Sequence, residues 1–326
     1  MTSSPEPLPS PLVPARIAVL LPCYNEAQGI AKVVADFRAA LPEATIYVYD
    51  NNSTDDTRRI AAEAGAIVRR ETQQGKGHVV RRMFADIEAD IYLMCDADDT
   101  YEAAAAGGMV ELLRRDGLDM VVGTRQQGEV NMYRPGHHMG NKLLTGLVRG
   151  IFGDRFTDML SGYRVFSRRF VKSFPVMSGG FEIETELTIH ALELEMPADE
   201  VKTKFSERAA GSESKLRTFH DGFRILGTIT LLLKQERPFL TFSVIGLVLA
   251  LIGLGLGIPV VLDFLRTGLV ERLPTAVLSS ALMVLASLSF FSGMILRTVT
   301  RGRQEVKRMS YLSVPGVHAL DDPPRG

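Results

Sequence analysis

The stretch from Ile91 to Tyr101 reads IYLMCDADDTY, an apolar run that ends in a cluster of carboxylates. The run has the length and composition of a buried strand. Asp96, Asp98 and Asp99 follow it within four residues, and because such charges repel one another and are costly to bury, we expect a cation to compensate them. Asp96 and Asp98 are hard oxygen ligands at a strand end, which suits Mg²⁺ or Mn²⁺ that shares its coordination with substrate phosphates.

Strand and helix signals alternate around this stretch, from Arg16 to about Arg217. Apolar strands are predicted at residues 17–22, 45–50, 66–68, 91–95 and 119–124. Helices are predicted through 30–41, after the capping candidates Ser53 and Thr54, through 79–87 and through 110–113. Strands buried on both faces and joined by helices predict an α/β fold, a mainly parallel sheet with helices on both faces.

Two more polar clusters follow predicted strands. They are Pro22-Cys23-Tyr24-Asn25-Glu26 after the first strand and Asp50-Asn51-Asn52 after the second. Each cluster alone fits a helix cap or a turn as well as a ligand site. Parallel sheets bind ligands at the carboxyl ends of their strands, so the convergence of the clusters on one edge favours a binding site there.

Composition excludes several classes of protein. The chain of 326 residues has 37 basic and 38 acidic residues, a formal net charge of -1, and no global signature of a nucleic-acid partner. Its two cysteines, Cys23 and Cys95, are predicted to be free thiols in a reducing compartment. Residues 1–15 are rich in Pro and Ser, which indicates a disordered tail and no secretory signal.

Two long apolar segments lie near the other end of the chain. Pro238–Leu262 and Leu273–Leu296 contain no charged residue. At about 1.5 Å per residue, a helix of either length crosses a hydrocarbon core of about 30 Å. Residues 238–297 are therefore predicted to form a two-helix transmembrane hairpin, and a pair of long buried core helices is the alternative.

Basic residues flank the apolar segments. Arg217, Arg224, Lys234 and Arg237 precede the first segment, and Arg297, Arg301, Arg303, Lys307 and Arg308 follow the second. The positive-inside rule predicts an integral protein of the cytoplasmic (inner) membrane, with the α/β domain and both termini cytoplasmic and residues 298–326 as a basic tail. Residues 218–237 fit an amphipathic juxtamembrane helix on the leaflet, a helix packed on the soluble domain, or both. Gly253, Gly255 and Gly257 would let two copies associate as a homo-oligomer.

The polar clusters and a glycine-rich tripeptide resemble a known motif series. PCYNE at 22–26, DNNSTDDT at 50–57, GKG at 75–77 and DADD at 96–99 are similar in order and spacing to the motifs of family 2 glycosyltransferases. The resemblance implies a GT-A fold, a nucleotide-binding α/β domain, as the catalytic domain over residues 16–217.

Further landmarks narrow the resemblance to one group. They are GTR at 123–125, Arg134 ahead of Asn141, TDMLSGYR at 157–164 and R-x-x-G-x-x-S-K at 208–215. Together with two C-terminal spans, they resemble the polyprenyl-phosphate glycosyltransferases, which include dolichol-phosphate mannose synthases and undecaprenyl-phosphate sugar transferases.

The resemblance implies a role for each matching residue. Around the nucleotide of a nucleotide-diphosphate sugar it places Pro22, Tyr24, Asn25 and Glu26 at the base and ribose, Asp50 with Asn52 beside it at the base, and Lys76 in the adjoining loop. Asp96 and Asp98 would hold the metal, with Asp98 in direct contact. Arg125 and Arg134 would receive the phosphate of a polyprenyl phosphate, and Arg208, Ser214 and Lys215 would belong to a loop that closes over the donor diphosphate.

The chain departs from the family pattern at two places. Asp99 and Thr100 stand where close relatives have Leu and Gln, which removes the usual third side-chain ligand and leaves Thr100 or a water to replace it. The closing loop has one extra residue, so Ser212 and Ser214 are alternatives for its serine.

The implied chemistry is an inverting hexosyl transfer. A lipid phosphate with a second pKa of about 6 is already anionic at neutral pH and needs no strong protein base. The site must supply positive charge, from the metal with Lys215 or Arg208 at the departing diphosphate and from Arg125 and Arg134 at the acceptor. We predict one in-line displacement that moves a hexose from a UDP- or GDP-sugar to a polyprenyl phosphate, for cell-envelope glycan or glycoconjugate assembly.

Other interpretations stay open. The chain could be a family 2 enzyme with a glycan or protein acceptor, a D-x-D-x-T phosphatase, which DADDT also matches, or a non-catalytic membrane scaffold. His137 and His138, in a Pro-Gly loop, fit either ligands or a solvated turn. Glu182, Glu184 and Glu186 alternate along the chain, which fits either a contact with sugar hydroxyls or a half-exposed face.

Overall fold

The computed structural model describes residues 15–126, 155–180, 182–206 and 238–317. The chain forms two compact units, one of Met1–Gly222 with Lys307–Gly326 and one of Phe223–Val306. The predicted juxtamembrane helix at 218–237 and nearly all of the predicted tail at 1–15 lie outside the described residues.

A seven-stranded sheet forms the centre of the first unit. Its strands are β1 (Ile17–Cys23), β2 (Thr45–Asp50), β3 (Ile67–Arg70), β4 (Ile91–Met94), β5 (Met120–Gln126), β6 (Arg164–Ser167) and β7 (Ala198–Lys204). In the order β3-β2-β1-β4-β6-β5-β7, every neighbouring pair is parallel except the two that involve β6. The mainly parallel sheet predicted from the sequence is confirmed, with β6 and β7 as strands that the prediction lacked.

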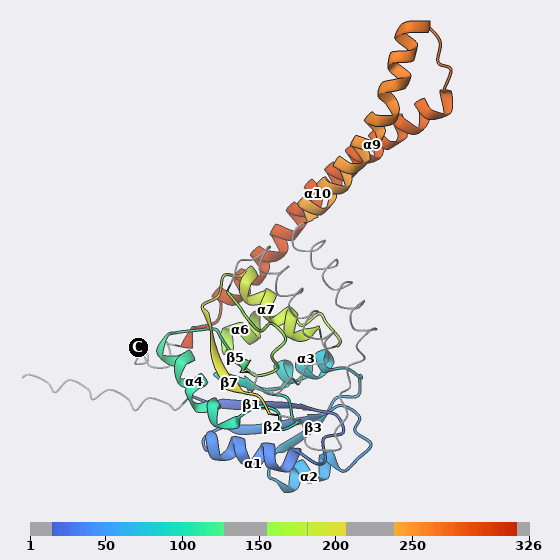
Figure 1. Cartoon of the computed structure of the whole chain (residues 1–326). Helices are drawn as coiled ribbons and strands as arrows, with labels where there is room; N and C mark the ends of the chain where they lie inside the picture. The colour runs from blue at the N-terminus through green and yellow to red at the C-terminus, as the bar shows by residue number, and fades with distance from the viewer. Residues whose placement is uncertain (1–14, 127–154, 181, 207–237, 318–326) are drawn as a thin grey trace, which may run out of the picture. The chain divides into compact units, whose positions relative to one another are not determined.

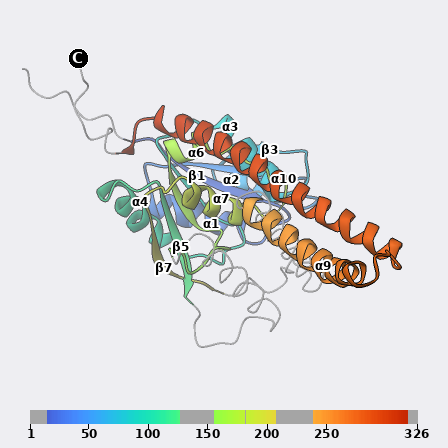
Figure 2. The same cartoon turned by 90° about the horizontal axis from the view of Figure 1, so that it is seen from above.

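Helices cover both faces of this sheet, as predicted (Figures 1 and 2). One face carries α1 (Ile30–Ala40), α2 (Thr57–Glu63), the short η1 turn (Ala103–Ala105) and α4 (Ala106–Arg115), and the other carries α3 (Lys76–Asp86), α6 (Arg168–Ser173) and α7 (Ile183–Glu193). Val33, Val34 and Phe37 of α1 belong to one buried cluster with Val19 and Leu21 of β1. Their helical spacing on one element and alternation on the other explain why both elements form together.

The described residues 307–317, near the end of the chain, belong to the first unit. Helix α10 (Leu273–Leu312) continues into the residues predicted as the tail 298–326. Lys307 Nζ lies 2.6 Å from Glu193 Oε2, the Tyr311 hydroxyl donates to Asp119 over 2.8 Å, and Val317 is buried in the core. Lys307 is one of the basic residues that follow the second apolar segment, and its partner Glu193 is buried. The local sequence gives no sign of this pairing.

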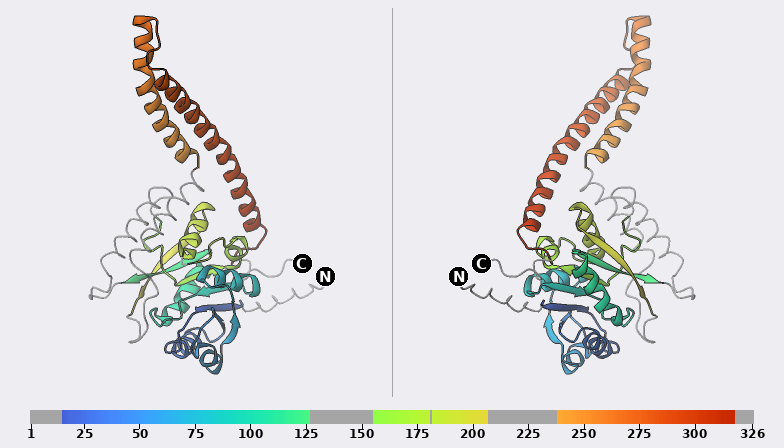
Figure 3. Two further views of the ribbon diagram at one scale, coloured as in Figure 1. Left: turned by 90° about the vertical axis from the view of Figure 1, so that its right-hand side faces the viewer. Right: turned by 90° about the vertical axis from the view of Figure 1, so that its left-hand side faces the viewer.

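The second unit is built on α9 (Pro238–Thr267) and α10, which are long and apolar enough to cross a membrane, with mean hydropathies of 2.7 and 1.8 (Figure 3). Only 17% of each apolar window is buried, so neither helix has the surroundings of a long core helix within the described residues. Ser279 donates to Gly253 O over 2.8 Å, and a Cβ on Gly257 would lie 2.4 Å from Ser279 Oγ. Two of the three glycines predicted to pair separate copies therefore pack inside the hairpin.

Candidate functional site

The two polar clusters after β1 and β2 interlock at the carboxyl edge of the sheet. Cys23 pairs in register with Asp50, so the two strands end together. Asn25, with a left-handed φ of 53°, donates its backbone N–H to Ser53 and accepts from the backbone N–H of Thr54 over 2.8 Å. The backbone N–H of Glu26 donates to Thr57 over 2.9 Å. The predicted convergence of these clusters on one edge is thus present in the structure.

Asp50 presents a buried carboxylate at this edge. Its side chain is fully buried, and Oδ2 accepts from the backbone N–H of Ser53 over 3.3 Å and lies 3.6 Å from Arg58 Nε. Oδ1 has no hydrogen-bond partner among the described residues. A buried acceptor without a partner costs free energy unless a ligand donates to it, and the N–H edge of a nucleobase is such a donor.

Asn51 and Asn52 hold the loop that follows β3. Asn51 donates to the carbonyls of Glu71 and Gln73, and its Oδ1 accepts from the backbone N–H of Gly75 over 2.7 Å. Asn52 donates to Thr72 O over 2.9 Å. The side chain of Asn52, predicted in the donor site, is engaged in shaping this loop.

The acidic turn after β4 is ordered by its own hydroxyl and by a lysine on α1. Thr100 donates its hydroxyl to Asp98 Oδ1 over 2.6 Å, so Thr100 orients the carboxylate instead of presenting a free ligand. Asp99, with a left-handed φ of 59°, pairs with Lys32 at 2.7 Å. Asp98 is 8% exposed and Asp96 is more open, with 31% of its side chain exposed.

Lys76 is the cation that compensates this turn. Its ammonium group forms short ion pairs with both Asp96 and Glu184, and only 9% of its side chain is exposed. Burial by itself would lower the pKa of Lys76, but the attraction of the two carboxylates outweighs it and raises the pKa, so the ammonium is charged at neutral pH. Burial raises the pKa of Glu184, which its contact with Lys76 opposes. The reading of Glu182, Glu184 and Glu186 as a half-exposed face is wrong for Glu184, which is 5% exposed in α7.

The two glycines around Lys76 explain the GKG sequence. A Cβ on Gly75 would lie 2.1 Å from Gly179 O, and a Cβ on Gly77 would lie 2.2 Å from Ser178 O. Glu186 holds that opposing loop by accepting from the backbone N–H groups of Met177 and Ser178, each over 2.8 Å. The start of α3 can approach the loop only because both positions lack a side chain.

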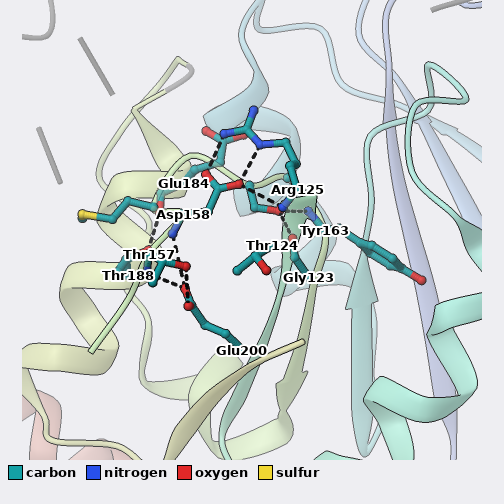
Figure 4. A network of polar contacts seen from close by, with 12 residues as sticks. Gly123, Thr124, Arg125, Thr157, Asp158, Tyr163, Glu184, Thr188 and Glu200 are labelled. Atoms are coloured by element: carbon teal, nitrogen blue, oxygen red, sulfur yellow. Dashed lines mark hydrogen bonds and ion pairs between the residues drawn. The ribbon is translucent and has the colours of Figure 1, made fainter. Parts of the chain in front are cut away.

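Arg125, predicted to receive a lipid phosphate, is paired with a carboxylate in the structure. Its guanidinium contacts Asp158 at 2.7 and 2.6 Å, in a fork-like pair that Figure 4 shows. Glu200 of β7 in turn accepts from the backbone N–H and hydroxyl of Thr157, over 2.7 and 2.6 Å. The guanidinium also lies over the ring of Phe205, at 5.6 Å. Arg125 is therefore held in place, with its charge already balanced by Asp158.

The TDMLSGYR motif packs against the acidic turn and β5. A Cβ on Gly162 would lie 2.3 Å from Asp96 Oδ2, so this glycine makes room for the carboxylate. Ser161 donates to Gly123 O over 2.5 Å, and the fully buried Arg164 donates to Met159 O and to Thr188 of α7. The motif thereby connects β5, the acidic turn and α7.

The residues present fit a hard divalent ion that shares its shell with a ligand. The described residues contain no group of three His, Cys, Asp or Glu side chains that could hold a metal by themselves. Asp96 and Asp98 supply two carboxylates, which is the partial shell that Mg²⁺ or Mn²⁺ completes with water and phosphate oxygens. Two carboxylates leave the other positions of such an ion's shell to oxygen atoms from outside the described residues.

Arg134, His137, His138, Arg208, Ser212, Ser214 and Lys215 lie outside the described residues. Pro22 and Tyr24 lie at the end of β1 and directly after it, beside the interlocked clusters. The structure therefore brings together Asn25, Asp50 and their neighbours at one edge, and Lys76 with Asp96.

Comparison with known proteins identifies the family of this chain. Residues 18–174 match the family model Glycosyl transferase family 2. Glycosyltransferase AglJ of Haloferax volcanii is 32% identical over 305 residues, 92% of this chain and 99% of that protein, so the chain belongs to this family. Protein RfbJ of Shigella flexneri is 57% identical over 122 residues, 37% of this chain and 95% of that protein. A dolichyl-phosphate hexose transferase of Haloferax volcanii is 28% identical over 222 residues, 68% of this chain and 95% of that protein.

Solved structures share the fold. Mannosyl-3-phosphoglycerate synthase from Rubrobacter xylanophilus matches with a TM-score of 0.56 at 22% identity, over 68% of this chain and 75% of that one. Glucosyl-3-phosphoglycerate synthase from Mycobacterium tuberculosis, in complex with Mn²⁺ and UDP-glucose, matches with a TM-score of 0.52 at 23% identity, over 68% and 77%. The fold class expected from the motif resemblance is confirmed.

Proposed function

We propose that the chain is a membrane-anchored inverting hexosyltransferase that uses Mg²⁺ or Mn²⁺ and moves a hexose from a UDP- or GDP-sugar to a polyprenyl phosphate. The observation that carries the proposal is the acidic turn of Asp96 and Asp98 at the same sheet edge as the unpartnered Oδ1 of Asp50. One group suits a metal–diphosphate and the other a nucleobase, which are the two ends of a nucleotide-sugar donor.

The proposed donor site divides the work among residues of three strand ends. Pro22, Tyr24, Asn25 and Glu26 surround the nucleoside, and Asp50 accepts from the base. Asp96 and Asp98 hold the metal, which when bound stabilises negative charge on the leaving diphosphate. Lys215 or Arg208, with Ser214, covers the diphosphate from the closing loop.

The proposed acceptor site uses arginines to bring a second anion close. Asp158 orients the guanidinium of Arg125 in a bidentate pair and balances its charge, so in this proposal Arg125 offers hydrogen-bond donors and Arg134 supplies the positive charge. The lipid phosphate attacks the anomeric carbon with its own charge, so no protein carboxylate has to remove a proton. The product is a lipid-phosphate-linked sugar with inverted anomeric configuration, for cell-envelope glycan or glycoconjugate assembly.

The membrane assignment follows from the acceptor and from the two long apolar helices. A polyprenyl phosphate stays in the bilayer, so the enzyme has to be attached to it. Relatives support this acceptor class, since one carries the name dolichyl-phosphate hexose transferase. Basic residues precede the first apolar helix and follow the second. Because flanks rich in Lys and Arg stay in the cytoplasm, we propose that the catalytic domain and both termini lie on the cytoplasmic side of the cytoplasmic membrane.

The test is a transfer assay with the full chain in detergent or in membranes. Undecaprenyl phosphate or dolichyl phosphate is incubated with labelled UDP- and GDP-hexoses, with Mg²⁺, Mn²⁺ or EDTA, and label is measured in the organic phase. Transfer that needs the divalent ion is expected from at least one donor. Folded protein that transfers to no polyprenyl phosphate contradicts the proposal and favours a glycan or protein acceptor.

A matched pair of variants tests the metal assignment. Asp98→Asn is expected to lower kcat by about 100-fold or more, because an amide is a poor ligand for a hard cation. Asp99→Asn is the control, since Asn tolerates the left-handed φ of 59° and the lost partner is the exposed Lys32. If the two variants have equal activity, the assignment of Asp98 as a metal ligand is wrong.

A further inference from the structure

The cluster around Lys76 carries an excess of negative charge that matches one divalent ion. We call Lys76, its partners Asp96 and Glu184, and Asp98 of the same turn as Asp96 the acidic cluster. Three carboxylates and one ammonium give it a formal charge of -2. A divalent cation would bring the formal charge of the acidic cluster to zero while all four side chains stay in place. In the structure, Asp96 is paired with Lys76.

Each carboxylate oxygen of Asp96 has a neighbour, although 31% of the side chain is exposed. Its Oδ1 is paired with Lys76, and its Oδ2 lies against the backbone of Gly162, where a Cβ would come within 2.3 Å. A metal that binds Asp96 through Oδ1 therefore meets an oxygen that already accepts a hydrogen bond from an ammonium. Lys76 and the metal need the same carboxylate.

Lys76 itself is anchored through its backbone and has a second partner. Gly75 donates to Asn51 over 2.7 Å, and Gly75 and Gly77 lie against the carbonyls of Gly179 and Ser178, so the start of α3 is fixed. Glu184, which is 5% exposed, remains within reach when Asp96 is taken away. The lysine can release one carboxylate without becoming an unpaired buried charge.

We propose that Lys76 is a resident counter-cation that competes with the divalent metal for Asp96 and keeps Glu184 as its partner when the metal binds. The inference rests on the metal-dependent function proposed above. It assigns Lys76 as a positioning residue, which prevents mutual repulsion of the acidic cluster in the metal-free protein. Its consequence is a low metal affinity in the absence of donor, so that the donor diphosphate supplies the remaining ligands.

The test measures Mn²⁺ binding to the donor-free full chain, by titration calorimetry and by the loss of the free Mn²⁺ electron paramagnetic resonance signal. The variant is the double substitution Lys76→Met with Glu184→Gln, which removes one charge of each sign and leaves the formal charge at -2. Removal of the competitor is expected to tighten Mn²⁺ binding by about tenfold. Unchanged or weaker binding overturns the proposal, because net charge alone predicts no change.

Lys32→Met is the control for charge without contact. Lys32 pairs with Asp99 in the same turn, but its side chain is 62% exposed and it is not the partner of Asp96. Salt screens exposed charges, so Mn²⁺ affinity is expected to change by less than about twofold. A gain equal to that of the double variant would assign the effect to general electrostatics and overturn the competition.

A second measurement uses the wild-type chain and does not depend on the folding of a variant. Acylation of Lys76 by an amine reagent, mapped by mass spectrometry, is expected to increase when Mn²⁺ replaces EDTA, while Lys32 is labelled equally in both. Equal labelling of Lys76 in both conditions contradicts the proposal. Because neither measurement uses donor or acceptor, their failure is distinct from a failure of lipid glycosylation.

Discussion

At the scale of single residues, buried charges are kept by specific partners. Arg164 is fully buried, and burial lowers its pKa to about 10, so it is still protonated at neutral pH. It donates to two backbone carbonyls and to Thr188 of α7. A charge that is expensive to desolvate is thus fixed by hydrogen bonds that hold the TDMLSGYR motif on α7.

His190 predicts how stability depends on pH. Burial lowers its pKa to about 3, with a smaller contribution from Lys307, whereas an unfolded histidine titrates near 6.5. Below about pH 6.5 the unfolded chain takes up a proton that the folded chain refuses, so this contribution is complete above that pH and is lost as the pH falls. From pH 8 to pH 5 the loss is roughly 2 kcal/mol.

Unfolding of the wild type and of His190→Gln, followed by circular dichroism at both pH values, measures this effect. The variant cannot gain that proton, so its free energy of unfolding is expected to fall less between pH 8 and pH 5. An equal fall in both proteins would show that His190 does not carry the dependence.

The sequence predicts the polar edge of the sheet but not several of the ion pairs found there. Asp50, Asp96 and Asp98 lie at the ends of apolar runs. A parallel sheet brings the carboxyl ends of its strands to one edge, independently of the loop conformations. Glu184 lies 108 positions from Lys76, and Asp158 lies 33 from Arg125, so their pairing depends on tertiary contacts with no local signature. Asp158 belongs to the TDMLSGYR motif. The signal that could have identified it is Arg125, because a cation directly after a predicted buried strand requires an acidic partner.

At the scale of elements, the approach of α3 to the loop at 177–180 sets the geometry around Lys76. Glu186 fixes the loop through two backbone N–H groups, and Arg81 donates to Val176 O over 3.0 Å. The helix and the loop are thus positioned from both sides. Any side chain added between them has to displace backbone.

Gly77→Ala is expected to lower the free energy of unfolding by about 1–3 kcal/mol and to weaken donor binding, because the new Cβ would lie 2.2 Å from Ser178 O. Gly108→Ala, in α4 with nothing within 4 Å of the new Cβ, is the matched control and is expected to stabilise by about 0.5–1 kcal/mol. Denaturant unfolding of both variants measures the contrast. A stable Gly77→Ala protein would contradict the close approach.

Among the elements that were not predicted, β7, β6 and α7 have identifiable physical reasons. β7, with the sequence ADEVKTK, is an edge strand with several exposed residues, so it lacks the apolar run of a central strand. β6 is only four residues long and follows directly on the TDMLSGYR turn. α7 is buried on nearly every side, so its apolar residues form no single stripe.

At the scale of the whole molecule, the first unit is completed by residues from the far end of the sequence. Tyr311 and Arg169 both bind Asp119, at the start of β5, and the Arg169 guanidinium lies 4.7 Å from the centre of the Tyr311 ring. Lys307 pairs with Glu193, whose side chain is 1% exposed. The contacts of Asp119 lie at the opposite end of β5 from Arg125.

Lys307→Met is expected to destabilise the first unit by about 3–5 kcal/mol, because it leaves the buried Glu193 carboxylate without its cation. Arg301→Met, which removes an 81% exposed partner of Glu305, is expected to have little effect. Thermal unfolding of the purified full chain in detergent compares the two. Equal melting temperatures would mean that the Glu193 pair does not stabilise the unit.

The late position of residues 307–317 also determines when the protein can finish folding. A ribosome that has just released the stretch up to residue 206 has made every strand of the sheet, yet Glu193 and Asp119 still lack their distant partners. Those partners emerge only after both apolar helices have been synthesised. Synthesis of both apolar helices therefore precedes completion of the first unit, and a nascent chain interrupted between the two would carry the buried Glu193 without its lysine, while the Asp119 carboxylate would keep Arg169 and Ser167 and lack Tyr311.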